Sequence, residues 1–352
     1  MIKIKPYFFF VIFLIASMLS SVAFINYLVD PFYVYNVRGH NNYYYGQRYT
    51  NPGLARNIDY DTAIIGSSHT ENTLGSYVSS VMNVKALKLS MADATAYEYK
   101  LLLDVVLGRE NTKNIIWGLD YFSFLGDDDR VSEGGSFPYH LFDIGMEKFF
   151  KYTLSKDTLE NSLRAITDRG IIGIDNLNTW NDPNSFGRDK LIYAFENECR
   201  HPRTILRNKL IPESDIKSNV EKNLKNIIAS RPDVKFKLFL PSYSAAYHVF
   251  IRDYSPALFN AQLEFRYLLE QLNEEMENVE LYDFQQLPLT QDDSLYLDLT
   301  HYNRGVNELL IDYIDQGEYL VEKGYYSEVA FLEYLSSIDM NLPAINLSCE
   351  IR

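Results

Sequence analysis

Short apolar runs alternate with helix-like stretches between residues 61 and 316, and no other feature constrains the fold as strongly. Each run has the length and composition of a buried strand. The five runs are Thr62–Gly66, Val84–Leu89, Asn114–Leu119, Lys235–Leu240 and Val279–Asp283. Strands that alternate with helices form a parallel sheet with helices on both faces. The sequence therefore predicts an α/β domain with a doubly wound, parallel, five-stranded sheet.

The stretches between the runs carry apolar residues at the spacing of a helix. In the stretch 213–230 these residues are Ile216, Val220, Leu224 and Ile227. This repeat indicates one buried helical face. Helices are predicted on the same grounds at 96–108, 213–230 and 257–277, after Asn303, and in the tail at 325–338.

The N-terminus has two lysines, Lys3 and Lys5, followed by an uncharged run from Tyr7 to Val29. A helix needs roughly 20 apolar residues to cross a bilayer, and the two lysines place the N-terminus in the cytoplasm. A cleaved signal peptide is the alternative, because Ser21-Val-Ala23 resembles a cleavage site. The apolar run continues past this point, so we favour an uncleaved anchor. In both cases the rest of the chain is exported.

Four regions follow from these patterns. Residues 1–29 are a cytoplasmic stub and a transmembrane anchor, and the polar, Tyr-rich residues 30–60 are a stalk. Residues 61–316 are the sheet domain, in which 125–205 breaks the strand–helix rhythm and is interpreted as an insertion. Residues 317–352 form a C-terminal tail.

Composition excludes several classes of protein. The chain has 352 residues, 47% of them hydrophobic, and a formal net charge of −14. The hydrophobic fraction excludes general disorder, and the acidic balance argues against binding to nucleic acid or to anionic lipid headgroups. The two cysteines, Cys199 and Cys349, form no cluster with metal-ligand spacing, so no structural metal site is expected. Sequence leaves their pairing open, and we expect two free thiols.

Two segments carry candidate chemistry. Ser68 follows the first strand and Gly66, at the sheet edge where doubly wound domains bind ligands. Asp298 and His301 lie three residues apart, just before the last predicted helix. An imidazole that a carboxylate orients can take the proton of a serine hydroxyl. Taken alone, each segment has a structural alternative: a Gly-Ser-Ser turn for the first, and a helix cap with an incidental histidine for the second.

Together, Gly-x-Ser68 after the first strand and Asp298-x-x-His301 before the last helix resemble the SGNH (GDSL-like) hydrolase superfamily. Ser67 then stands where the family has Asp. The N-terminal anchor and the Asn-Tyr-Leu-Val-Asp30-Pro exit from the membrane are similar to the envelope acyl-transfer branch, which includes the alginate O-acetylation proteins and the teichoic-acid D-alanylation protein DltD. The resemblance covers about residues 61–316. It implies that Ser68 is a nucleophile, His301 its base, and Asp298 the group that orients His301.

Two positions depart from that family. Asp93 stands where a glycine normally offers its backbone N–H to the oxyanion, and Asp tolerates left-handed backbone better than most residues. Asp120 stands at or near the place of an Asn. An ionised carboxylate would repel an oxyanion, so Asp120 helps only if burial keeps it protonated. The alternative is that Asp120 caps a turn.

Other polar residues rank lower. His69 adjoins the candidate nucleophile, but a neighbouring side chain usually points elsewhere. His140, His201 and His248 are interpreted as ordinary loop or surface histidines. Tyr243 follows the fourth strand and could line a substrate groove.

The resemblance implies a membrane-anchored serine esterase or O-acyltransferase that acts on acyl esters of envelope or extracellular polysaccharide. The reaction needs no metal and no cofactor. A multi-span membrane acyltransferase is the expected partner. The alternative is a catalytically inactive protein of the same fold that binds polysaccharide or acts as a scaffold in an acetylation complex, and Asp93 and Asp120 favour it.

Overall fold

The computed structural model describes residues 6–35, 46–132, 137–143, 145–167, 174–200 and 214–341. The chain divides into two compact units. One unit consists of Met1–Asp59 and Ser136–Leu177, and the other of Tyr60–Gly135 and Asn178–Arg352. We call them the anchor unit and the sheet unit.

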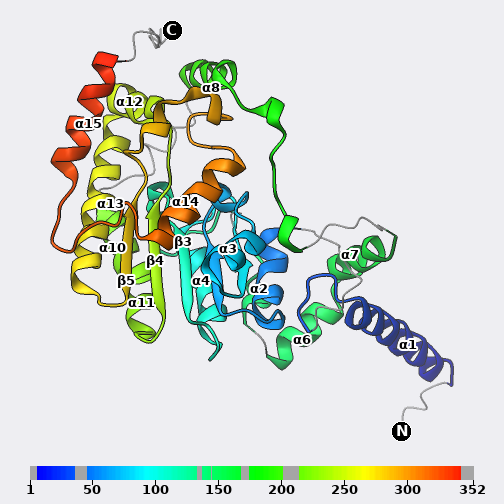
Figure 1. Cartoon of the computed structure of the whole chain (residues 1–352). Coiled ribbons are helices and arrows are strands. Elements are labelled where there is room, and N and C mark those ends of the chain that lie inside the picture. The colour runs from blue at the N-terminus through cyan, green and yellow to red at the C-terminus, as the bar shows by residue number, and fades with distance from the viewer. Residues whose placement is uncertain are drawn as a thin grey trace. The chain divides into compact units, whose positions relative to one another are not determined.

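The sheet unit contains one five-stranded parallel sheet, as predicted (Figure 1). Its strand order is β2-β1-β3-β4-β5. The chain therefore adds β2 on one side of β1 and the later strands on the other, which makes the sheet doubly wound. Most strand residues are buried, because helices cover both faces. The strands are β1 Thr62–Ile65, β2 Ala86–Lys88, β3 Asn114–Gly118, β4 Lys235–Leu240 and β5 Val279–Asp283.

Two sets of helices cover the two faces of this sheet. On one face α3 contacts α14, and on the other α4, α10 and α11 form a layer that continues to α13. Their bounds are α3 Gly75–Met82, α4 Ala96–Leu107, α10 Ser214–Val220, α11 Asn226–Ser230, α13 Pro256–Glu275 and α14 Arg304–Gln316. A π-helical turn, Glu221–Lys225, joins α10 to α11. The predicted helices 96–108, 213–230 and 257–277 are confirmed with shifts of one or two residues at their ends.

The remaining elements of the sheet unit lie in its connections and its tail. The helices are α8 Arg188–Arg200, α12 Ala245–Tyr254 and α15 Glu328–Asn341. The short 3-10 helices are η1 Ser68–Thr70, η2 Tyr121–Phe124, η4 Pro183–Ser185, η6 Pro288–Gln291 and η7 Asp293–Leu295. The predicted tail helix is therefore present, beginning three residues later than expected.

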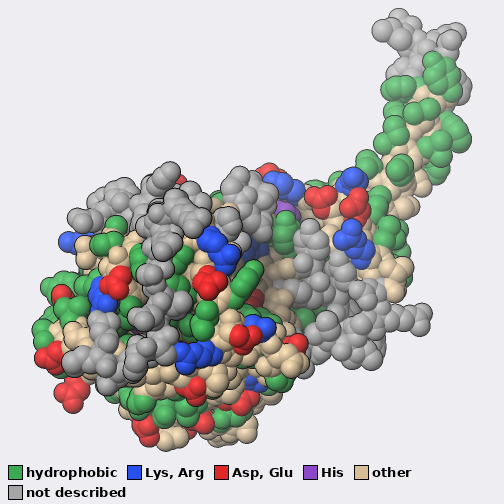
Figure 2. Space-filling view, turned by 90° about the horizontal axis from the view of Figure 1, so that it is seen from above, with side chains coloured by type: hydrophobic (Ala, Val, Ile, Leu, Met, Phe, Trp, Pro, Cys, Tyr) green, Lys and Arg blue, Asp and Glu red, His purple; other side chains and the backbone are tan. Residues whose placement is uncertain are grey.

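The anchor unit is built around α1, which runs from Pro6 to Val29 and is long and apolar enough to cross a membrane. Its other helices are α2 Gln47–Asn57, α5 Tyr139–Phe142, α6 Met146–Thr153, α7 Lys156–Thr167 and the short η3 Ile174–Asn176. Both α6 and α7 pack against α1. The side chains of α1 from residue 7 to residue 21 are exposed, and Figure 2 shows their apolar surface.

The predicted regions differ from these units. Within the predicted stalk, residues 30–60, the structure describes α2, which is largely buried in the anchor unit. This part of the stretch is therefore not a stalk. Residues 125–205 are not one insertion either: 136–177 cluster with the anchor, and the stretch from Asn178 clusters with the sheet. A pattern of hydrophobic residues shows which local segments fold, but it does not show which distant segments pack together.

Two further expectations are wrong. Cys199 is disulfide-bonded and is not a free thiol, while Cys349 lies outside the described residues. His248 is not a surface histidine, because its side chain is fully buried on α12 beside Gln262. Burial lowers the pKa of His248 to about 3, so it is neutral. His140 lies on α5, and His201 is outside the described residues.

Candidate active site

The backbone after β1 turns sharply to present Ser68. Gly66 has a φ of +156°, and a Cβ atom there would lie 2.5 Å from Cγ2 of Thr70. A Cβ atom on Gly118, at the end of β3, would lie 2.9 Å from the same methyl carbon. The two glycines therefore make room for Thr70, whose hydroxyl donates to the Ser67 carbonyl at 3.0 Å. This packing fixes η1 directly beyond the strand end.

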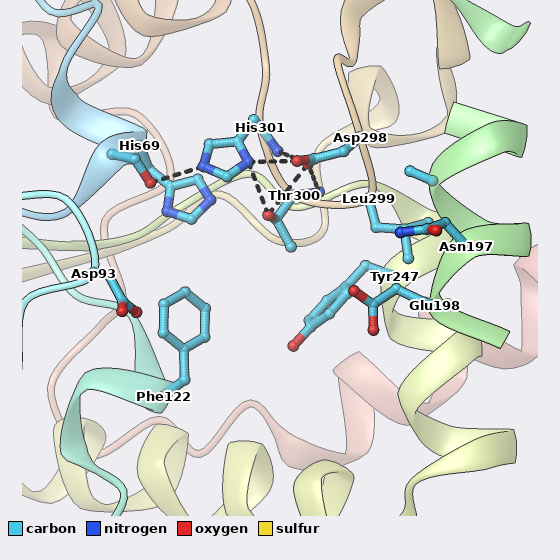
Figure 3. A pocket seen from close by; sticks show the side chains of 12 residues that line it. His69, Asp93, Phe122, Asn197, Glu198, Tyr247, Asp298, Leu299, Thr300 and His301 are labelled. Carbon is cyan, nitrogen blue, oxygen red and sulfur yellow. Dashed lines mark hydrogen bonds and ion pairs between the residues drawn. The ribbon is translucent and has the colours of Figure 1, made fainter. Parts of the chain in front are cut away.

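Ser68 and His301 meet as predicted. The Ser68 Oγ lies 2.7 Å from Nε2 of His301, and Nδ1 of His301 lies 2.7 Å from Oδ2 of Asp298. Figure 3 shows His301 beside Asp298 at the pocket. The geometry is that of a nucleophile, a base and a carboxylate that orients the base.

A tight loop holds Asp298 and His301 in this arrangement. The other carboxylate oxygen of Asp298 accepts hydrogen bonds from the backbone N–H groups of Thr300 and His301, each at 2.8 Å. The loop is fixed from outside by Ser244, whose hydroxyl donates to the Leu299 carbonyl at 2.6 Å. An antiparallel β-bridge between Tyr296 and Tyr302 joins the two ends of this loop. Asp298 is therefore part of the turn and also the partner of the histidine.

Charge and burial oppose each other at His301. Burial alone would lower its pKa, but the Asp298 carboxylate, with smaller effects from Asp120 and Glu71, raises the pKa above the ordinary value of 6.5. Burial would conversely raise the pKa of Asp298, and its contacts with His301 and the loop backbone keep that pKa far below its usual range. Asp298 is thus a permanent anion that stabilises a protonated His301.

Asp93 lines the pocket, and its backbone is left-handed with a φ of 52°. Glycine is the residue that most readily adopts this conformation, and Asp tolerates it better than most other residues. The turn around it is closed by the Ala94 N–H, which donates to the Met91 carbonyl at 3.2 Å. The donation of the Asp93 N–H to an oxyanion stays a prediction.

Asp120 is not on the pocket wall, and both interpretations made from the sequence need correction. Its carboxylate is completely buried and makes no capping bond to η2. It accepts hydrogen bonds from the hydroxyls of Ser67 and Tyr243, and Nδ1 of His69 lies 2.9 Å from it. Burial would raise the pKa of Asp120, but His69 and the two hydroxyls lower it, so the group stays ionised and is not a proton donor.

His69 therefore has a larger role than expected from its position beside Ser68. Its ring stacks on the His301 ring, with centroids 4.6 Å apart and planes 14° apart. Its Nε2 is buried and has no hydrogen-bond partner among the described residues. Tyr243, expected in a substrate groove, is instead buried against Asp120. The sequence run Ser67-Ser68-His69 was the available signal for this arrangement, but its partner Asp120 is remote in the chain.

Trp180 is a site residue that sequence reasoning missed. Its ring meets the His301 ring edge to face, with centroids 5.4 Å apart. Its Nε1 donates to the Glu71 carboxylate at 2.6 Å, and its backbone N–H donates to Asn72 at 2.8 Å. The signal for it was a tryptophan, one of only two in the chain, within a polar loop.

The candidate triad opens onto a cavity of about 490 Å³. Figure 3 shows Asp93 and Phe122 on one side and Asn197 and Glu198 of α8 on the other, with Tyr247 between them. The C-terminal part of the predicted insertion thus forms a wall of the pocket. The cavity is within the size range of small-molecule sites, and its lining mixes aromatic and polar groups.

Comparisons with known proteins add little to this geometry. No protein-family model matches the chain, and no curated protein matches it. A solved structure provisionally named as a platelet activating factor from Streptococcus pneumonia is similar, with 10% sequence identity and a TM-score of 0.39 over 77% of this chain and 89% of that chain.

Proposed function

We propose that this chain is a membrane-anchored serine esterase or O-acyltransferase of the SGNH type, which acts on acyl esters of envelope or extracellular polysaccharide. The observation that carries the proposal is the continuous chain of contacts from the Ser68 hydroxyl through His301 to Asp298, each 2.7 Å long. This chain ends at a cavity large enough for an acyl ester.

In the proposed reaction, Ser68 Oγ attacks the ester carbonyl carbon while its proton moves to Nε2 of His301. The carbonyl electron pair moves onto oxygen, where the backbone N–H groups of Ser68 and Asp93 stabilise it. The electron pair then returns from oxygen and re-forms the carbonyl, the C–O bond to the leaving alkoxide breaks, and His301 gives its proton to that alkoxide oxygen. A second hydroxyl or water attacks the acyl-serine by the reverse sequence and restores Ser68.

The pocket wall supports a carbohydrate hydroxyl as the acceptor. Asn197 and Glu198 offer polar groups, while Phe122 and Tyr247 offer ring faces and edges. Sugars present both hydroxyls and apolar C–H faces, so such a lining can bind them. The same wall would also admit water, and the balance between transfer and hydrolysis is the quantity to measure.

We also propose that residues 1–6 lie in the cytoplasm, that 7–29 span the inner membrane, and that the rest faces the periplasm or the exterior. The length and composition of α1 support the span. A disulfide at Cys199 agrees with an oxidising compartment. A multi-span membrane acyltransferase is the proposed acyl donor. A mature N-terminus at Phe24, found by mass spectrometry, would contradict the anchor but not the export.

The rival proposal is a non-catalytic binding protein of the same fold. It rests on carboxylates at the two predicted oxyanion positions, Asp93 and Asp120. Because Asp120 is buried and does not face the pocket, only Asp93 still supports it. The full chain, purified in detergent and given p-nitrophenyl acetate, tests the two. We expect ester cleavage that Ser68→Ala abolishes. Acetylated oligosaccharide, detected by mass spectrometry when an acceptor is added, would mark the transferase. No cleavage and no transfer would favour the rival.

A further inference from the structure

Beside the membrane-spanning helix α1, the anchor unit has two further helices, α6 and α7, that pack against it. The run of α1 whose side chains are all exposed extends from residue 7 to residue 21. At 1.5 Å per residue this run covers only roughly 22 Å. A bilayer has a hydrocarbon core of roughly 30 Å, so α1 must place its next turns at membrane depth as well. Both α6 and α7 contact α1, and in those turns Asn26 bonds to Thr153 and Ser162.

The contact between α7 and α1 has the character of helix packing in a membrane. The buried face of α7 consists of the small or polar residues Thr158, Asn161, Ser162 and Ala165. Small residues let helices approach closely in lipid, and polar side chains bond across them. Asn26 of α1 is fully buried there. Its amide donates to the Thr153 carbonyl at 2.8 Å, and its oxygen accepts from Ser162 at 3.0 Å.

Both short helices also present an apolar face to the outside. On α6 and its C-cap, Met146, Phe150 and Leu154 follow one another at intervals of four residues and are 82%, 54% and 41% exposed. On α7, Leu163 and Ile166 are 51% and 57% exposed. Proteins in water rarely expose apolar side chains in such regular stripes. We call these five residues the apolar stripes.

Two exposed charged residues, Lys151 and Arg164, lie beside the stripes. On α6 the exposed Lys151 follows Phe150, and on α7 the exposed Arg164 lies between Leu163 and Ile166 in sequence but points to another side of the helix. Each helix therefore has one side toward α1, one apolar side and one charged side. Helices of this kind lie in the plane of a membrane interface, with the apolar side in the acyl chains.

We propose that α6 and α7 lie in the outer membrane–water interface beside α1, with the apolar stripes in contact with lipid acyl chains. The occupant of this surface is lipid because α1, the helix against which both pack, is the membrane span. The inference rests on the proposed anchorage and goes beyond it. The exported chain would contact the membrane through three helices, two of them from residues remote from the anchor in sequence.

Site-directed spin labels on the full chain in phosphatidylcholine nanodiscs test this proposal. One label each is placed at Phe150→Cys and Ile166→Cys, with matched controls at Lys151→Cys and Arg164→Cys and a reference at Ile12→Cys in α1. The readout is the ratio of each label's collision rate with oxygen to its collision rate with a water-soluble nickel complex. We expect this ratio to be severalfold higher at 12, 150 and 166 than at 151 and 164.

The reference separates two kinds of failure. If the label at 12 reports lipid while 150 and 166 match their controls, the anchor stands and the proposal is overturned. If the label at 12 reports water, the anchorage fails and the proposal fails with it. Labels at 150 and 166 that are shielded from both reagents would indicate a protein contact and would also overturn it.

Discussion

Two histidine–carboxylate pairs lie side by side in this protein. They share the same hydrogen-bonding groups but differ in the exposure of the histidine ring and in the partner of its Nε2. In both, Nδ1 of the ring meets a carboxylate, Asp298 for His301 and Asp120 for His69. The ring of His301 is one quarter exposed and its Nε2 reaches Ser68. The ring of His69 is buried and its Nε2 has no partner among the described residues.

The difference shows that the hydrogen-bond partners of each carboxylate determine what its histidine can do. Asp298 is held by backbone N–H groups of its own loop, so His301 is free to exchange a proton with a hydroxyl at the pocket. Asp120 is held by hydroxyls from two other segments, so it joins Ser67, His69 and Tyr243 beneath the site. On this account the first pair carries out proton transfer, and the second positions the first through the stacked rings.

The largest expected effect concerns the two adjacent serines. We expect Ser68→Ala to lower p-nitrophenyl acetate hydrolysis by roughly 10⁴-fold or more, since the members of a triad act as a unit. Ser67→Ala is the matched control, because it leaves Ser68 and His301 in place. It removes the hydroxyl that donates to Asp120, lies 2.9 Å from Nδ1 of His69 and accepts from the His69 N–H. We expect it to fold, with a stability loss of about 1–3 kcal/mol, and to keep most of its activity. A Ser67→Ala variant as inactive as Ser68→Ala would contradict the assignment of the nucleophile.

The next effect concerns Asp298. We expect Asp298→Asn to lower kcat by roughly 10⁴-fold, because an amide does not hold the histidine in the right tautomer or stabilise its protonated form. The measurement is steady-state hydrolysis with circular dichroism as a check on folding. A loss of less than tenfold would mean that His301 does not depend on this carboxylate.

The pH dependence follows from the same pair. His301 must be neutral to accept the serine proton, and its pKa lies above 6.5. The kcat/KM of the wild type should therefore fall as pH decreases, with a midpoint above 6.5. Since Asp298 raises this pKa while burial lowers it, the residual activity of Asp298→Asn should fall at a lower pH. Superimposable profiles would show that the acid limb belongs to another group.

Asp120→Asn should have a smaller effect, and it should lower both stability and kcat. Both oxygens of the carboxylate accept hydrogen bonds, and an amide would turn an NH₂ group toward one of the donors. We expect destabilisation by about 1–3 kcal/mol, with a reduced kcat and an unchanged KM. Thermal unfolding and hydrolysis rates measure both. Faster hydrolysis in Asp120→Asn at neutral pH would place Asp120 back in the oxyanion site.

The smallest effect is expected at Trp180. Trp180→Phe keeps a ring beside His301 but loses the bond to Glu71. An aromatic pair contributes about 0.5–1.5 kcal/mol, so Trp180→Ala should lose several-fold in activity, and Trp180→Phe less. Equal activity in the wild type and both variants would show that this loop does not support the base.

The sequence predicted one of the two pairs and not the other for a physical reason. Asp298 and His301 are three residues apart, and Ser68 follows a strand whose carboxyl end marks the ligand edge of the sheet. Local pattern and topology together were therefore sufficient. His69 and Asp120 meet only because β1 and β3 are neighbours in the sheet, and the direction in which each side chain points depends on packing that no local pattern records.

The same limit applies to the fold. All five strands were predictable because each is a short apolar run with its own boundaries. The anchor unit was not, because it joins segments distant in sequence: Asn26 bonds to Thr153, 127 residues away. The polarity of residues 30–60 predicts a stalk, whereas α2 within that stretch is largely buried.

Covalent labelling of Ser68 tests the central claim most directly. A fluorophosphonate reacts with an activated serine: the Oγ–P bond forms, fluoride leaves and the proton passes to the base. We predict one adduct per chain, mapped to Ser68 by peptide mass spectrometry, and absent in both Ser68→Ala and His301→Ala while Ser67→Ala is still labelled. No adduct on the folded wild type, or an adduct on another residue, would contradict the proposal that Ser68 is a nucleophile activated by His301.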